Sequence, residues 1–247
     1  MSILAVRNLS KSFGGVGAVR NVSFSVAAGE LLALIGPNGA GKTTCFNMLN
    51  GQLAPDSGEV EFEGRSLKGL APRSIWRLGV GRTFQITATF GSMTVRENVQ
   101  MALLSHARRL GSLFSSFSVS QVEEANSLLG RVGMLEQAER HCAVLAYGDL
   151  KRVELAVALA NAPRLLLMDE PTAGMAPRER SDLMQLAADL ARRSNIAVLF
   201  TEHDMDVVFT HADRIVVMAD GELIAEGDPA RVRADARVRE VYLGSHA

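Results

Sequence analysis

Cysteines are scarce in this chain: Cys45 and Cys142 are the only two among 247 residues. That number argues against a disulfide framework and favours reduced thiols in the cytosol. There is also no excess of positive charge, since 26 Lys and Arg face 27 Asp and Glu, so the composition gives no reason to expect nucleic-acid binding.

Long apolar runs are missing as well. No run exceeds about half a dozen residues, whereas about 20 are needed to span a bilayer. The first ten residues, MSILAVRNLS, lack the apolar core of a secretion signal. We therefore expect a soluble protein, and any role at a membrane would depend on a partner.

Three apolar segments predict the central strands of an α/β fold. Residues 31–35 (LLALI) form a continuous apolar run, as in a strand buried on both faces. Segments 164–170 and 195–204 are similar, and each ends in polar residues. Because open parallel sheets bind ligands at the carboxyl ends of their strands, we expect the functional site at that edge.

Other segments indicate antiparallel structure and an inserted helical region. Residues 3–9, 16–26 and 58–64 have the composition or alternation of strands, and 214–227 predicts a hairpin with a type I′ turn at Asp220-Gly221. Within 87–151, capping boxes at Thr94/Glu97 and Ser120/Glu123 each precede apolar residues at helical spacing. The predicted divisions are a core of approximately 1–86 and 152–227, a helical subdomain of approximately 87–151, and a helical tail of approximately 228–247.

The segment GPNGAGKTT (36–44) directly follows the strand at 31–35 and matches the phosphate-binding loop pattern G-x-x-x-x-G-K-[ST]. Glycines let several backbone N–H groups point at one anion, and the following helix adds the positive end of its dipole. Lys42 is expected to reach the β- and γ-phosphates and Thr43 to ligate Mg²⁺. A glycine-rich turn without a ligand is the alternative. The residues expected to contact nucleotide here are Asn38, Gly39, Ala40, Gly41, Lys42, Thr43 and Thr44.

Four polar residues near other strand ends are candidates for catalysis. Asp169 is expected to hold Mg²⁺ and Glu170 to act as general base on the attacking water, although either could instead cap the next helix. His203 is expected to contact the γ-phosphate, with a structural histidine as the alternative. Gln85 would sense both Mg²⁺ and the attacking water, or be an ordinary polar residue.

A glycine-containing turn upstream of Asp169 decides between classes of phosphate-binding protein. The segment LAYGD (145–149), taken with the loop, Gln85, Asp169-Glu170 and His203, resembles the ATP-binding subunits of ABC transporters. The resemblance implies a P-loop NTPase (RecA-like) core with an inserted α-helical subdomain and a small antiparallel β subdomain, in one ATP-binding domain over 1–247. It implies ATP and Mg²⁺ as cofactors and ATP hydrolysis as the reaction.

In that family the signature turn is offered to nucleotide held by a second subunit. The resemblance therefore assigns Tyr147, Gly148 and Asp149 to a nucleotide across a dimer interface. It also assigns Phe13 to stacking on adenine, with core packing as the alternative, and places Val19 beside the same ring.

Further segments are similar to the ATPase subunits of branched-chain amino acid importers. They are RTFQ, MTVREN, AYGDLKRVELA, DEPTAGMAP, TEHDM and VYLG. The implied partners are transmembrane permease subunits, a second ATP-binding subunit of the same or another kind, and indirectly a periplasmic or extracellular substrate-binding protein. The implied location is peripheral, on the cytoplasmic face of the inner membrane. Related systems import urea or amides, or export lipid or lipopolysaccharide, and those assignments stay open.

The chain departs from the family pattern at Ala146, Asp149 and Ala176. Ala146 lacks the hydroxyl of the usual signature serine, which predicts a weakened signature because a hydrogen bond to a charged group contributes about 1.5–3 kcal/mol. A soluble ABC ATPase would call for coiled-coil insertions, two cassettes or basic patches. A P-loop kinase or GTPase would leave 145–149 and His203 without a purpose.

Overall fold

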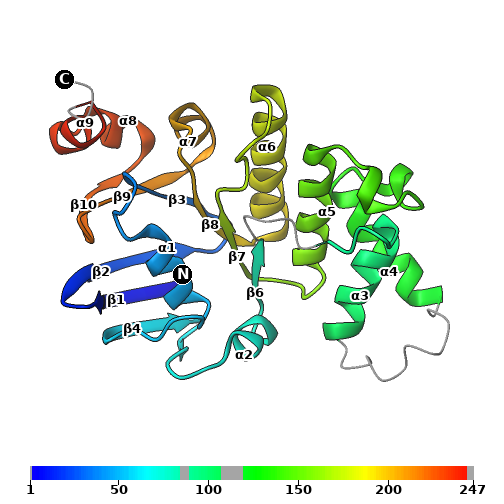
Figure 1. Cartoon of the computed structure of the whole chain (residues 1–247), viewed down its shortest axis with the longest axis horizontal. Helices are drawn as coiled ribbons and strands as arrows, with labels where there is room; N and C mark the ends of the chain where they lie inside the picture. The colour runs from blue at the N-terminus through cyan, green and yellow to red at the C-terminus, as the bar shows by residue number, and fades with distance from the viewer. Residues whose placement is uncertain (1, 84–88, 107–118, 244–247) are drawn as a thin grey trace.

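The computed structural model describes residues 2–83, 89–106 and 119–243, and its elements form two β-sheets with helices around them (Figure 1). The larger sheet has six strands, of which all but β10 run parallel to their neighbours. In spatial order they are β10 (Glu222–Gly227), β9 (Arg214–Ala219), β3 (Leu31–Ile35), β8 (Ala197–Thr201), β7 (Leu165–Asp169) and β6 (Val80–Thr83). The strands predicted at 31–35, 164–170 and 195–204 are the three at its centre.

The smaller sheet is antiparallel and contains the strands predicted at 3–9, 16–26 and 58–64. Its order is β2 (Val16–Ala27), β1 (Ser2–Phe13), β4 (Ser57–Phe62) and β5 (Arg65–Ser66). Together the two sheets confirm the predicted α/β fold with a separate antiparallel part.

Strand β3 joins two hydrophobic clusters because its five residues are all apolar. Leu31, Ala33 and Ile35 pack into one cluster, whereas Leu32 and Leu34 pack into the other. In Figure 1, α6 and α7 lie on one side of the larger sheet, and α1 with the antiparallel sheet lies on the other. Each of the five side chains is completely buried. An alternating polar pattern would have exposed one face, so the continuous apolar run is what makes a central strand possible.

Nine helices are described. They are α1 (Lys42–Leu49), α2 (Pro72–Arg77), α3 (Val95–His106), α4 (Val119–Arg131), α5 (Tyr147–Leu159), α6 (Pro177–Ser194), α7 (Met205–His211), α8 (Pro229–Ala234) and α9 (Ala236–Leu243). Helices α3, α4 and α5 stand together at one end of the molecule (Figure 1). Within the described ranges, no helix combines the length and the apolar character that a bilayer span requires.

One predicted capping box is confirmed and the other is wrong. The Thr94 amide donates to Glu97 Oε2 at 2.7 Å and the Glu97 amide donates to Thr94 Oγ1 at 3.2 Å, a reciprocal pair that starts α3. Helix α4 instead begins at Val119, so Ser120 already lies inside it.

The tail forms two short helices, not the single helix that the sequence suggested. Asp228 caps α8 by accepting from the Arg231 amide at 2.8 Å. Asp235 has an extended backbone conformation, which separates the two helices. Its carboxylate accepts from the Arg237 amide at 2.8 Å and so caps the start of α9. The hairpin before the tail turns at Asp220 and Gly221, whose φ angles of 48° and 82° are both positive, as a type I′ turn requires.

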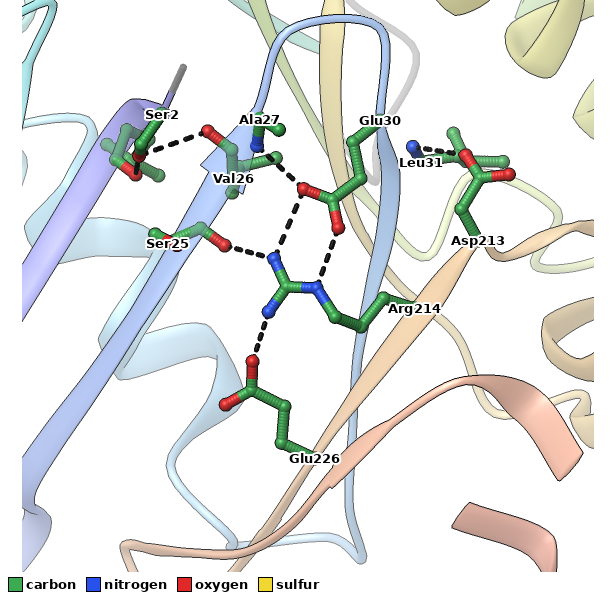
Figure 2. Close-up of polar contacts among 10 residues, drawn as sticks. Ser2, Ser25, Val26, Ala27, Glu30, Leu31, Asp213, Arg214 and Glu226 are labelled. Carbon is green, nitrogen blue, oxygen red and sulfur yellow. Dashed lines mark hydrogen bonds and ion pairs between the residues drawn. The ribbon is translucent and has the colours of Figure 1, made fainter. Parts of the chain in front are cut away.

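Arg214 ties both sheets together at the amino-terminal ends of β3 and β9 (Figure 2). Its guanidinium donates to Glu30 at 2.7 and 3.1 Å, to the Ser25 carbonyl oxygen at 2.5 Å, and to Glu226. Glu30 also accepts from the Ala27 amide at 2.6 Å. The guanidinium of Arg214 in β9 therefore connects β2, β10 and the residue that precedes β3.

Replacing Arg214 by alanine should lower the free energy of unfolding by about 2–3 kcal/mol, less than for a fully buried pair because its side chain is 24% exposed. Arg192→Ala is the matched control, because the Arg192–Asp213 pair is 54% and 39% exposed and should contribute less than about 1 kcal/mol. Urea denaturation of both variants measures the difference. Equal losses would contradict the assignment.

Candidate nucleotide site

The loop between β3 and α1 contains two glycines that other residues cannot replace without a clash. A Cβ atom on Gly36 would lie 2.2 Å from the Met218 carbonyl oxygen, and one on Gly41 would lie 2.2 Å from that of Ala18. Gly41 also has a φ of +98°. The loop therefore passes close to two neighbouring backbones, which fixes its curve.

Lys42 directs its ammonium group back into this loop. Its Nζ donates to the carbonyl oxygens of Gly36 at 2.6 Å and Pro37 at 3.1 Å. Burial lowers the pKa of Lys42, while the negative charges of Glu170 and Asp169 oppose this shift. Lys42 thus lies within electrostatic reach of both carboxylates, although they come from a distant part of the sequence.

Asp169 ends β7 with both carboxylate oxygens engaged. The Thr201 hydroxyl donates to Oδ1 at 2.8 Å, and Arg82 Nη2 donates to Oδ2 at 3.3 Å. The residue is 6% exposed, so these contacts stabilise a charge largely removed from water.

Glu170 adopts a backbone conformation that is rare for a residue with a side chain. Its φ is +47°, and its amide is held by the Thr201 carbonyl and hydroxyl oxygens, both at 3.1 Å. The turn brings Glu170 Oε1 to 2.8 Å from His203 Nε2 at the end of β8. Such strained residues concentrate at functional sites, where surrounding hydrogen bonds stabilise them.

Glu202 supports this arrangement, and the sequence analysis did not identify it. Its buried carboxylate accepts from the Thr172 amide at 2.8 Å, the Thr172 hydroxyl at 2.6 Å, and the His203 amide at 3.1 Å. It therefore joins the loop after Glu170 to the loop that carries His203. Only its position in TEHD, beside His203, could have drawn attention to it.

Tyr147, Gly148 and Asp149 form the first turn of α5, away from the loop. In Figure 1, β7 and α6 lie between α1 and α5. A Cβ on Gly148 would lie 3.2 Å from Glu179 Oε1, so the turn packs against the start of α6. Asp149 Oδ2 accepts from Gln137 Nε2 at 3.1 Å, and Tyr147 is 41% exposed.

The remaining candidates differ in exposure. Phe13 is 50% exposed with Lys11 Nζ 5.8 Å from its ring centre, whereas Val19 is buried in the core under α1. Gln85 lies outside the described residues. The candidates in the phosphate-binding loop and the first turn of α1 also differ in exposure. Asn38, Gly39 and Thr43 are exposed, Gly41 and Thr44 are half-buried, and Ala40 is buried.

Residues 19–173 of the sequence match a family model described as ABC transporter. This chain belongs to the ABC transporter family. A second model, described as branched-chain amino acid ATP-binding cassette transporter, matches residues 222–247.

Curated and solved relatives of this cassette cover nearly its full length. The high-affinity branched-chain amino acid transport ATP-binding protein LivG of Salmonella typhimurium is 42% identical, over 98% of each chain. A solved ADP conformation of an ATP-binding cassette of an ABC transporter is 33% identical, with a TM-score of 0.88 over 99% of each chain. A dimeric post-hydrolysis cassette bound to ADP and phosphate is 26% identical, with a TM-score of 0.77 over 92% of this chain and 98% of its own.

The cassette's loop and carboxylates fit a nucleotide with a divalent cation. Nothing lies within 4 Å of a Cβ atom built on the exposed Gly39, so no other part of the chain covers the loop at this residue. The exposed Thr43 hydroxyl and the Asp169 carboxylate are oxygen donors, which Mg²⁺ prefers.

Two glycine substitutions should separate loop strain from loop clash. Gly39→Ala, at a φ of +84° in open space, should cost about 1–2 kcal/mol of stability and weaken nucleotide binding modestly. Gly41→Ala adds the collision with Ala18 and should be clearly more damaging to both. Urea denaturation and titration with a fluorescent ATP analogue measure the two effects, and equal losses would contradict the close-approach argument.

Proposed function

We propose that this cassette hydrolyses ATP to drive a membrane transporter that imports branched-chain or other hydrophobic amino acids. The observation that carries the proposal is the 2.8 Å contact between Glu170 and His203, at the ends of adjacent strands, with Lys42 in electrostatic reach. The amino acid class rests on LivG and on the C-terminal family match.

Each candidate has a distinct role in this reaction. The loop amides and Lys42 bind the phosphates, and Thr43 and Asp169 hold Mg²⁺. Gln85 is assigned to sensing Mg²⁺ and the attacking water. Bound Mg²⁺ would neutralise charge on the β- and γ-phosphates. Glu170 takes the proton of the attacking water while His203 orients Glu170 and contacts the γ-phosphate.

Nucleotide is held between two cassettes in the proposal. Phe13 stacks on adenine, as its exposure allows, and Val19, which is largely buried, flanks the same ring from the core side. Tyr147, Gly148 and Asp149 face the nucleotide of the second subunit, either another copy or a companion cassette. Support comes from the dimeric cassette among the solved relatives.

A permease subunit docks in a groove between α2, β6, α3 and α5. The groove has a volume of about 450 Å³ and is lined by Ile75, Trp76, Arg82, Ala102 and Val157, among others. Phe90, 56% exposed, extends the apolar surface beside α3. Docking there holds the cassette on the cytoplasmic face of the inner membrane, and a substrate-binding protein acts through the permease.

We also propose that the chain divides into a core (approximately 1–86 and 152–227), a helical subdomain (approximately 87–151) and a tail (approximately 228–247). The groove then lies between the core and the helical subdomain. The division at 151 falls within α5, which runs from Tyr147 to Leu159. Because α5 is one continuous helix, the residues on either side of 151 would move together.

Replacing Glu170 by glutamine should lower ATP turnover by about 10²–10⁴-fold, because the amide cannot accept the water's proton. Nucleotide should still bind, so the variant should accumulate as an ATP-bound dimer with itself or with a companion cassette. Phosphate release and light scattering with MgATP measure the two effects. Glu124→Gln, on the exposed face of α4, is the control. Failure of the Glu170 variant to pair with any cassette would contradict the shared site.

Uptake into membrane vesicles tests the substrate class. With the permease subunits and binding protein of its own system, the cassette should drive ATP-dependent uptake of leucine, isoleucine and valine, and Lys42→Ala should abolish it. Urea and short amides should not compete. Uptake of urea instead, or outward movement of lipid, would replace the amino acid assignment with one of the related systems.

A further inference from the structure

Arg82 reaches from β6 both to the end of α1 and the loop after it, and to the carboxylate of Asp169. Its Nη2 donates to Asp169 Oδ2 at 3.3 Å, and its Nη1 donates to Asn47 Oδ1 at 3.2 Å and Gln52 Oε1 at 2.9 Å. The Arg82 and Asp169 side chains are only 14% and 8% exposed. The contact is therefore well enclosed, and the nucleotide-binding roles described above do not require it.

The Arg82 guanidinium donates to the carboxylate oxygen of Asp169 that Thr201 does not contact. Since Thr201 donates to Oδ1, Oδ2 is the oxygen that Arg82 covers. A divalent cation at that oxygen would lie close to the guanidinium, and two positive charges at such a distance repel each other strongly in a poorly hydrated site. Binding of a cation to Asp169 and retention of the Arg82 contact are thus in competition.

Arg82 can move away without leaving its charge buried and unpaired. It lines the open groove between α2 and α5 together with Gln52 and Asn50. Gln52 and Asn47 already accept from it on that side. Burial lowers the pKa of Arg82 while Asp169 opposes that shift, so the carboxylate helps to offset the desolvation of the guanidinium in the inward position. Loss of the carboxylate to a cation would favour the outward position.

We propose that Arg82 is a positioning residue that holds the Asp169 carboxylate in the metal-free cassette and is displaced from it when Mg²⁺ and nucleotide bind. It thereby sets the Mg²⁺ concentration at which the site loads. The proposal rests on the nucleotide-binding function proposed above and deepens it.

The test measures binding of a fluorescent ATP analogue to the purified full chain as Mg²⁺ is raised from an EDTA baseline. Arg82→Gln removes both the competitor and its charge, so the half-saturating Mg²⁺ concentration should fall about three- to tenfold. Arg214→Gln is the matched control: it removes a comparably enclosed arginine–carboxylate pair at the other end of the sheet and should leave the Mg²⁺ dependence unchanged.

Two further measurements cover failure of Arg82→Gln to fold. Arg82→Met keeps a long unbranched side chain but removes the charge, and it should lower the half-saturating Mg²⁺ concentration at least twofold, as Arg82→Gln does. In a structure of the wild-type chain with Mg²⁺ and a non-hydrolysable ATP analogue, Arg82 Nη2 should lie more than about 4 Å from Asp169 Oδ2, beyond ion-pair distance.

An unchanged or higher Mg²⁺ requirement in the folded Arg82 variants would overturn the proposal. Persistence of the 3.3 Å contact in the Mg²⁺-bound structure would also overturn it. A wild-type chain that binds no nucleotide at any Mg²⁺ concentration would instead overturn the proposed function, and the role of Arg82 with it.

Discussion

The pairing of β7 with β8 is the constraint on which the site depends. Both strands are buried throughout and apolar up to their last residues, and their parallel register places those last residues, Asp169 and Thr201, opposite each other. That one pair supplies the hydroxyl on Asp169 and both acceptors for the Glu170 amide. A slip of one residue would turn Asp169 to the other face of the sheet and remove all three contacts. The chemistry of the edge is therefore fixed by the packing of the strands behind it.

Each charged group at this edge already has a partner within the chain. Lys42 donates to loop carbonyl oxygens, Asp169 accepts from Thr201 and Arg82, and Glu170 contacts His203. A ligand would therefore exchange existing contacts for new ones. The free-energy difference of each exchange is small compared with the contact itself, as for hydrogen bonds in general. Such a site keeps its geometry without ligand and still binds reversibly.

The sequence predicted the parts of this structure that follow from local patterns. The apolar runs identified the three central strands, and the glycine spacing at 36–41 identified the loop whose close approaches the structure shows. Contacts between residues far apart in the sequence could not be predicted from local patterns. Arg82 lies in the quoted segment RTFQ, yet nothing local indicates that it reaches Asp169, 87 residues away. The same holds for Glu202 and Thr172, and for the strained turn at Glu170, because tertiary packing alone brings these groups together.

The signature turn shows how opposing local effects combine. Ala146 is the N-cap of α5 and has no side-chain acceptor, so no N-cap side chain accepts from the first-turn amides. Asp149 lies in the first turn, where a carboxylate interacts favourably with the helix dipole but lowers its attraction for a second anion. Gln137 takes up one oxygen of that carboxylate, and Lys151 lies with its Nζ 5.4 Å from the Tyr147 ring centre. The Lys151 ammonium already pairs with Glu154 Oε2 at 3.0 Å, so its charge is taken up there and not by Asp149. A phosphate approaching the turn would therefore meet the backbone amides and a reduced, but still positive, helix end.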